Sequence, residues 1–179
     1  MRLTGRTTTP AGRRSAAIGV GAAAIALAGA SLAAPAAAQE RAAAPAGTYC
    51  GPTESFYGNG QWTYAEVQLC LQADSSGAVS VVVNTRQVQY YWGSAWYYAS
   101  SGSPASWDAK GAAGVGGTSH SYGVSGRQTS AAGSASAALS TTVCGTYSVT
   151  MTYHQVGPYW GSDQALDSGQ RTYSINVPC

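Results

Sequence analysis

Only a few side chains in this sequence could take part in acid–base or nucleophilic catalysis. The chain has two histidines, His120 and His154, and catalysis by a serine, a histidine and a carboxylate requires the three groups to be in contact. Ser119, His120 and Asp108 are one conceivable set, but the sequence contains neither a Gly-x-Ser-x-Gly nucleophile turn nor a His-Glu-x-x-His zinc helix. We expect His120, which lies in a Gly- and Ser-rich segment, to be a solvated loop residue.

The carboxylates do not indicate a hydrolase or a metal site. Glycoside hydrolysis uses two carboxylates across a cleft, and the acidic residues show no recognisable spacing for it: Glu54, Glu66, Asp74, Asp108, Asp163 and Asp167. Asp163 and Asp167 could help to hold calcium, but the dense Asp/Asn/Gly loop of a calcium site is missing. We therefore expect no enzymatic activity, no cofactor and no metal.

Aromatic side chains offer a different kind of chemistry, which is recognition. Residues 90–92 and 96–98 are all Tyr or Trp and flank Gly93-Ser94, a pattern that predicts a β-hairpin with a two-residue, type II′-like turn. Successive side chains of a strand point to opposite faces. One face of the hairpin would then carry Tyr90, Trp92, Ala95 and Tyr97, and the other would carry Tyr91, Trp96 and Tyr98.

A small sheet usually buries one face and exposes the other, so we expect one of these aromatic sets to meet solvent. The rings could serve only as cross-strand pairs, which contribute about 0.2–1 kcal/mol each. They could instead form a stacking platform for a ligand, because Tyr and Trp offer a large apolar body with a polar tip. The candidate ligand-binding residues are Tyr90, Tyr91, Trp92, Trp96, Tyr97 and Tyr98.

The first 38 residues are expected to be a cleaved signal peptide. Residues 16–32 form an uncharged, Ala-rich segment, and Ala36-Ala37-Ala38 supplies a cleavage site. The basic start consists of Arg2, Arg6, Arg13 and Arg14. A membrane anchor needs about 20 strongly apolar residues, so we expect secretion without stable membrane insertion. Arg13-Arg14 leaves twin-arginine export as the alternative to Sec-type export.

Removal of this segment changes the length and charge of the protein. Cleavage after Ala38 leaves 141 of the 179 residues, which suits one domain. It also removes four of the nine basic residues, so that five basic and seven acidic residues give a net charge of −2 instead of +2. No basic patch for phosphate binding remains, and we expect no nucleic-acid partner.

All four cysteines lie beyond the expected signal peptide: Cys50, Cys70, Cys144 and Cys179. An even number in an exported chain predicts two disulfides, with three possible connectivities. Close Cys-x-x-Cys spacing for a metal is absent. We favour 50–70 with 144–179, which gives each half of an internal repeat its own disulfide, over 70–144 with 50–179.

Strand patterns cover much of the mature chain. We expect a flexible lead-in over residues 39–47, then an alternating strand over 62–73, a turn at 74–77 and a longer strand from Val79. Residues 99–138 are rich in Ser, Gly and Ala and predict loops with one or two short strands. Further strands are expected over 135–143 and 172–177, and sustained helical periodicity is absent.

An internal repeat relates two of these strands. Residues 80–94 align with residues 148–162 at an offset of 68, with eight identities in fifteen positions. The alternation shifts parity in both copies, which predicts a β-bulge between positions 84 and 87 and another between 152 and 155. His154 aligns with Arg86 and is expected to face solvent. We infer a duplication with copies around 62–98 and 135–166.

Together these features predict an all-β, antiparallel sandwich over residues 48–179, with an open barrel as the alternative. The aromatic hairpin and two disulfides are loosely similar to small secreted bacterial β-sandwich binding modules, without a motif that assigns residue roles. The expected function is non-enzymatic binding of a polysaccharide or another ring-bearing ligand. An inhibitor of a secreted protease, inserting a loop near residues 102–105 or 157–158, is one alternative, and a structural envelope or matrix protein is another.

Overall fold

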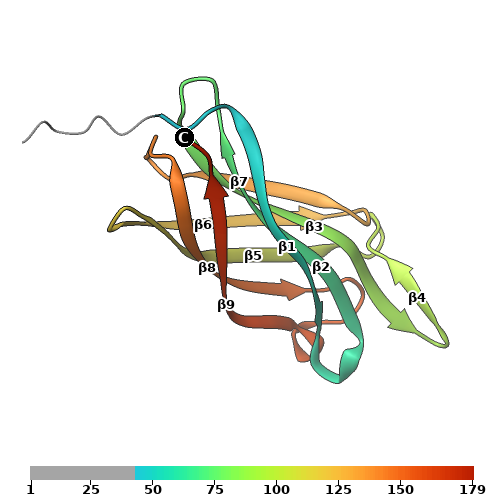
Figure 1. Ribbon diagram of the computed structural model, residues 1–179. Helices are drawn as coiled ribbons and strands as arrows, with labels where there is room; N and C mark the ends of the chain where they lie inside the picture. The colour runs from blue at the N-terminus through green and yellow to red at the C-terminus, as the bar shows by residue number, and fades with distance from the viewer. Residues whose placement is uncertain (1–42) are drawn as a thin grey trace, which may run out of the picture. The chain divides into compact units, whose positions relative to one another are not determined.

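The computed structural model describes residues 43–179; residues 1–42, with the expected signal peptide and the start of the lead-in, lie outside this range. The described chain forms two antiparallel sheets that are not closed into a barrel, which confirms the predicted sandwich (Figure 1). One sheet has the order β1-β2-β3-β4, with β7 also paired with β3, and the other has the order β6-β5-β8-β9. The elements are β1 (Gly47–Tyr57), η1 (Asn59–Gln61), β2 (Thr63–Ala73), β3 (Val79–Trp92), β4 (Ala95–Tyr98), β5 (Ala105–Val115), β6 (Thr118–Gln128), β7 (Gly133–Ala138), β8 (Gly145–Val156), η2 (Ser162–Gln164) and β9 (Leu166–Val177).

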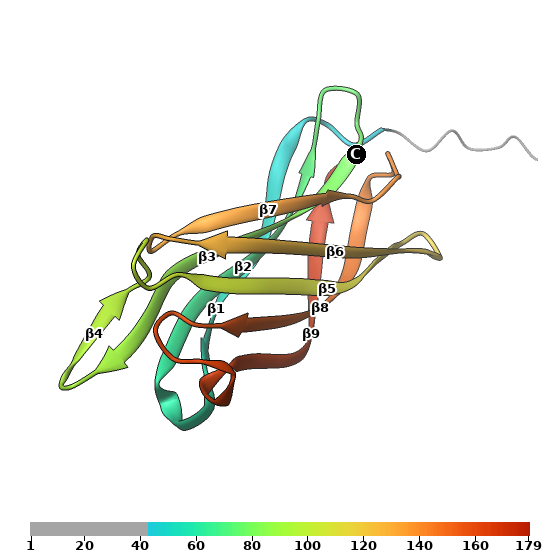
Figure 2. The same cartoon turned by 180° about the vertical axis from the view of Figure 1, so that it is seen from behind.

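The two sheets bury one apolar core between their inner faces. Strand β2 alternates as predicted, and its inner face carries Thr63, Ala65, Val67, Leu69 and Leu71, all fully or almost fully buried. Strand β8 supplies the opposite side of the core with Tyr147, Val149, Met151 and Tyr153. At the margins β1 lies beside β9 and β7 lies beside β6 (Figure 2). Among residues 43–179, no helix is long and apolar enough to cross a membrane.

Strand β3 has a different neighbour along each half of one side. Strand β7 pairs with residues 80–85, and β4 pairs with residues 89–92. At the boundary of these halves, β3 has one residue more than β2 between Arg86 and Gln89, and Gln87 has a φ of 51°. The β-bulge predicted between positions 84 and 87 is therefore present, displaced to 86–89. Because a bulge bends its strand, it accompanies the point at which the β3–β4 hairpin leaves the sheet (Figure 1).

The second predicted irregularity is present, between Thr152 and His154, but its extra residue does not lie on β8. Side chains of β8 alternate without a break, and both Tyr153 and Gln155 are buried. The extra residue lies on the partner strand β9, where Gly169 has a φ of 63°. Gln155 interrupts the apolar pattern in the sequence because it is polar but buried. Its side chain accepts a hydrogen bond of 2.7 Å from the Tyr153 hydroxyl and donates one of 2.9 Å to the Gly157 carbonyl.

The two predicted repeat copies do not each form one sheet. Strand β7, which belongs to the second predicted copy, pairs with β3 of the first copy, whereas β8 lies in the other sheet. The second copy therefore contributes to both sheets. The duplication itself stays a prediction from the sequence.

Residues 99–138 contain more regular structure than their composition predicts. Strands β5 and β6 are 11 residues each and form a hairpin, followed by β7. The turn is Gly116-Gly117, with φ of 56° and 83°, as a type I′ turn requires. The hairpin also needs a small residue inside β5. A side chain at Gly111 would collide with the carbonyl of Thr150, which accepts a hydrogen bond of 2.8 Å from the Tyr122 hydroxyl. Because Ala, Gly and Ser differ little in hydrophobicity, the sequences of β5 and β6 show no clear alternation of apolar and polar residues.

Part of the expected lead-in is packed against the domain. Ala43 forms a β-bridge with Val143, and Ala44 is buried and donates its N–H to the carbonyl of Thr142 at 3.0 Å. Ala43 and Ala44 therefore contact the domain, whereas Pro45 and Ala46 are exposed. The flexible lead-in over residues 39–47 stays a prediction.

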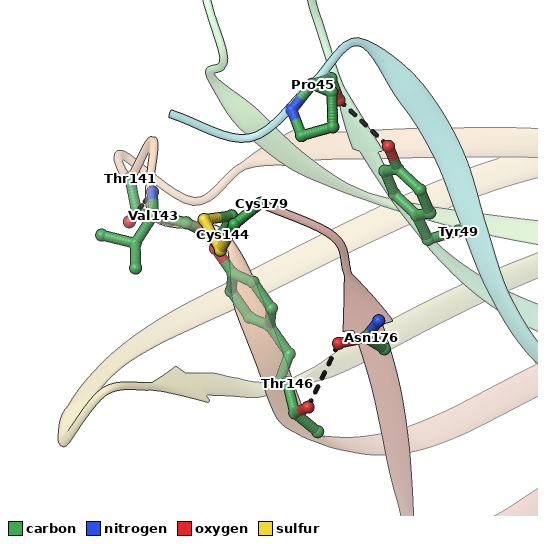
Figure 3. Close-up of a disulfide and its surroundings, with 9 residues drawn as sticks. Pro45, Tyr49, Thr141, Val143, Cys144, Thr146, Asn176 and Cys179 are labelled. Carbon is green, nitrogen blue, oxygen red and sulfur yellow. Dashed lines mark hydrogen bonds between the residues drawn. A yellow bond between two sulfur atoms is a disulfide. The ribbon is translucent and has the colours of Figure 1, made fainter. Parts of the chain in front are cut away.

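The two disulfides have the favoured connectivity. Cys50 pairs with Cys70 across the adjacent strands β1 and β2. Cys144 pairs with Cys179 and ties the start of β8 to the C-terminus, beside a hydrogen bond of 3.3 Å between the side chains of Thr146 and Asn176 (Figure 3). Two disulfides fit an oxidising, extracytoplasmic environment.

Candidate functional site

The β3–β4 hairpin has the register that its sequence predicts. Tyr91 pairs with Trp96 and Tyr90 pairs with Tyr97, and Gly93 has the φ of 64° that the first position of a type II′ turn needs. The expectation that one aromatic face is buried is wrong. All four residues of β4 are exposed, because the hairpin projects past the end of the sheet and other elements cover it only in part (Figure 1).

Ten aromatic side chains are connected by ring contacts at this end of the domain, and we call them the aromatic surface. Five were predicted as ligand-binding residues: Tyr90, Tyr91, Trp92, Trp96 and Tyr97. Five come from other elements: Tyr57, Trp62, Tyr64, Tyr159 and Trp160. In the described part of the chain, every exposed large hydrophobic side chain except Tyr98 belongs to this surface.

One face of the hairpin continues the outer face of the first sheet. There Trp96 contacts Tyr91 edge-to-face, with ring centroids 5.5 Å apart, and also meets Tyr64 at 6.0 Å and Tyr57 at 6.4 Å. Trp62 packs at 5.8 Å on the other side of Tyr91. Edge-to-face contacts leave parts of the ring faces uncovered, and Trp96 is 39% exposed.

A hollow of about 270 Å³ opens on this face between Trp62, Tyr91 and Trp96, with Gly60 and Gln61 along its rim. An apolar cavity of about 150 Å³ is enough to hold benzene. The hollow can therefore admit one six-membered ring against the indoles, with the Gln61 amide at its edge.

A polar network borders the same face. The Tyr64 hydroxyl donates to Glu66 Oε1 at 3.0 Å and lies 3.0 Å from the hydroxyl of Ser55. Burial raises the pKa of Tyr64 above 10.0, and its contact with Glu66 acts in the same direction. The Tyr64 hydroxyl therefore keeps its proton, and the Glu66 carboxylate provides a hydrogen-bond acceptor beside the rings.

The other face of the hairpin meets the loop that follows β8. Tyr90 lies between Tyr97 and Tyr159 in a stack, with centroid distances of 5.6 and 5.1 Å and interplanar angles of 29° and 8°. Trp160 donates its indole N–H to the carbonyl of Tyr91 at 3.0 Å and contacts the ring of Trp92 at 5.8 Å. Since Trp160 also contacts Trp62, the two faces form one continuous surface.

Tyr98 is the one predicted ligand-binding residue that stands apart from the connected rings. It is half exposed, and its hydroxyl donates to Gln87 Oε1 at 2.9 Å. Gln87 is the left-handed residue of the β3 bulge. Tyr98 therefore links the base of the hairpin to the bulge.

Two further non-glycine residues with left-handed backbone border the aromatic surface. Tyr159 has a φ of 64°, and Gln61 has a φ of 61° beside the hollow. Such conformations are uncommon for these residue types and concentrate at functional sites. In both places the unusual backbone accompanies an exposed side chain at the aromatic surface.

The candidate catalytic residues are not brought together. Ser119 and His120 lie near the β5–β6 turn, where His120 pairs with Ala113, whereas Asp108 lies opposite Ser125 toward the other end of the same hairpin. His154 is partly exposed, and its Nδ1 lies 2.7 Å from Asp167 Oδ1. Within residues 43–179, no group of three or more His, Cys, Asp or Glu side chains is placed to hold a metal ion.

Sequence reasoning missed half of the aromatic surface, although part of the signal was present. Tyr159 and Trp160 align with Tyr91 and Trp92 in the predicted repeat, so the repeat could have identified them as candidate ligand-binding residues. Tyr57, Trp62 and Tyr64 reach the aromatic surface through strand pairing and turn geometry, which cannot be inferred from the individual residues. No protein-family model, no curated protein and no solved structure matches the chain.

Proposed function

We propose that the aromatic surface binds a polysaccharide, and that the protein is an exported, non-enzymatic binding protein. The observation that carries this proposal is the gathering of six exposed aromatic side chains into one connected surface: Tyr57, Trp62, Trp92, Trp96, Tyr97 and Tyr159. Soluble monomers rarely expose large contiguous apolar patches unless the patch binds something.

The composition of the surface favours sugars over other ligands. Aromatic faces carry partial negative charge, which attracts the polarised C–H groups on the flat side of a pyranose ring. The hydroxyls of the tyrosines, the Glu66 carboxylate and the Gln61 amide lie around the rings and can bond to sugar hydroxyls. A cluster of Lys or Arg for anionic lipid or nucleic acid is missing from the residues that form this surface.

The inhibitor alternative would need a different inserting segment from the one expected. The segments at 102–105 and 157–158 pack against each other: Ala105, Gly157 and Pro158 are buried, and a side chain at Gly157 would collide with the Pro104 carbonyl. The β3–β4 hairpin projects from the domain (Figure 2). An inhibitor that uses this hairpin would insert Trp and Tyr side chains into its target.

A depletion assay tests the proposal. The purified protein is mixed with insoluble chitin, cellulose, xylan and peptidoglycan, and the protein left in solution is measured. We expect saturable retention by at least one polysaccharide, with at least tenfold weaker retention of Trp96→Ala and Trp62→Ala.

Two controls separate loss of binding from loss of folding. Far- and near-ultraviolet circular dichroism must show that each variant keeps its strands and its aromatic packing. Tyr147→Phe alters an aromatic residue that is fully buried in the core and should retain binding. Equal retention of wild type and a folded Trp96→Ala variant would contradict the proposal. Binding of a secreted protease by the protein, in the absence of polysaccharide binding, would favour the inhibitor alternative.

A further inference from the structure

A row of polar side chains crosses the outer face of the second sheet. Ser125 on β6 lies opposite Asp108 on β5, Asp108 lies opposite His154 on β8, and His154 lies opposite Asp167 on β9. Neighbouring strands are about 4.8 Å apart, so the row extends over about 14 Å. That length exceeds a single sugar ring.

A second row lies next to this one, two residues further along the same strands toward the hairpin, and consists of Arg127 on β6, Ser106 on β5 and Val156 on β8. All of these residues except Asp167, together with Trp107 and Gly126, line a hollow of about 520 Å³. It combines a guanidinium, an imidazole, a carboxylate and two hydroxyls, so it can both donate and accept hydrogen bonds. The His154 Nδ1 is held by Asp167 at 2.7 Å, so Nε2 is the nitrogen with which His154 would bind a ligand.

A second hollow joins this one to the aromatic surface. It has a volume of about 350 Å³ and shares Ser106 and Val156 with the first. Its other wall is formed by Tyr159 and Trp160, which belong to the aromatic surface, and by Ser103 of the β4–β5 loop. A track therefore leads from the indoles, past Tyr159, onto the polar rows of the second sheet.

We infer that the ligand is an extended polysaccharide chain that stacks on the aromatic surface and continues through this track to Asp108, Arg127 and His154. This inference rests on the proposed function, because the aromatic surface supplies one end of the path. The stacked end would hold the ring faces, whereas the polar end would bond the hydroxyls of the following sugars. A terminal sugar or a disaccharide would occupy the aromatic end alone.

Isothermal titration calorimetry with oligosaccharides of defined length tests this inference. The probes are the dimer and hexamer of β-1,4-linked glucose and of β-1,4-linked N-acetylglucosamine. We expect the hexamer of at least one series to bind at least tenfold more tightly than its dimer. The double variant Asp108→Ala/His154→Ala, and separately Arg127→Ala, should lose this tenfold gain and keep the affinity for the dimer.

Ser174→Ala serves as the matched control, because Ser174 is exposed on the same sheet, opposite Ser148 and away from the polar rows. Equal affinity for dimer and hexamer, or unchanged hexamer binding by the folded groove variants, would overturn the extended path and leave the aromatic site standing. If Trp96→Ala binds every probe as the wild type does, or if no probe binds, the proposed function fails together with this inference.

Discussion

Trp160 donates its indole N–H to the main-chain carbonyl of Tyr91, with 3.0 Å between the two atoms. The two residues belong to the identical segments Tyr91-Trp92-Gly93-Ser94 and Tyr159-Trp160-Gly161-Ser162, which are 68 positions apart. The segments therefore meet in space and join the hairpin and the loop after β8 into one aromatic surface. This bond ties the projecting hairpin to the loop after β8.

Replacement of Trp160 by phenylalanine should loosen the hairpin. The variant removes the N–H donor and keeps most of the aromatic contact, so we expect a loss of about 1 kcal/mol in the free energy of unfolding. Urea unfolding measures this loss, and hydrogen exchange should show faster exchange of the amides in residues 90–97. Trp62→Phe alters a ring in contact with Trp160 but leaves the Trp160 N–H bond intact, so it should leave that exchange slow; equal exchange in Trp160→Phe and wild type would refute the role of the bond.

The turn of the hairpin gives a matched pair of glycine substitutions. Gly93 has a φ of 64°, whereas Gly161, its repeat equivalent, has a φ of −79°, and a side chain would meet nothing within 4 Å at either position. Gly93→Ala should cost about 1–2 kcal/mol through left-handed backbone alone, and Gly161→Ala should be nearly neutral. Chemical denaturation compares them, and equal stabilities of the two variants would contradict the assigned turn.

The disulfides should contribute unequally to stability. They close segments with sequence separations of 20 and 35 residues, and loop-closure entropy assigns them about 3.3 and about 3.8 kcal/mol. Cys50→Ala/Cys70→Ala should therefore destabilise the protein less than Cys144→Ala/Cys179→Ala, as measured by guanidinium unfolding. The reverse order would show that loop entropy does not dominate.

Alkaline pH should destabilise the fold through its buried tyrosines. Burial raises the pKa of Tyr122 and Tyr153, and raises that of Tyr173 to about 12. In the unfolded chain these phenols ionise near pH 10, so above that pH the unfolded state loses protons that the folded state retains. The free energy of unfolding should be constant from pH 8 to about 9.5 and should fall as the pH rises toward 12. Tyr173→Phe should weaken the fall, and a flat profile up to pH 12 would contradict the burial of these hydroxyls.

Much of the fold could be predicted because its signals are local. The alternation of β2, the hairpin register around Gly93 and the disulfide pairing all follow from short-range pattern and the repeat. Strands β5 and β6 escaped recognition because Ala, Gly and Ser give little contrast between inner and outer faces. The buried Gln155 assigned the second bulge to β8 instead of β9, since a polar residue that is hydrogen-bonded inside a core cannot be distinguished by composition from an exposed one.

The site was predicted only as far as it is contiguous in sequence. The hairpin residues were found, but Tyr57, Trp62 and Tyr64 join them through the pairing of β1, β2 and β3. The polar row from Ser125 to Asp167 depends on the register of four strands, two of which had not been recognised. Residues that meet only through long-range register cannot be collected from the sequence of a single chain.

Tryptophan emission during titration with a polysaccharide tests the central claim most directly. Four of the five tryptophans lie in the aromatic surface, and the fifth, Trp107, is almost fully buried beside the hollow of the second sheet, so Trp107→Phe leaves reporters in the aromatic surface alone. Titration of this variant with soluble chitin or xylan fragments should change the emission saturably, and a further Trp96→Ala substitution should abolish the change while circular dichroism stays unaltered. Unchanged emission with every polysaccharide that retained the protein in the depletion assay would contradict binding at the aromatic surface.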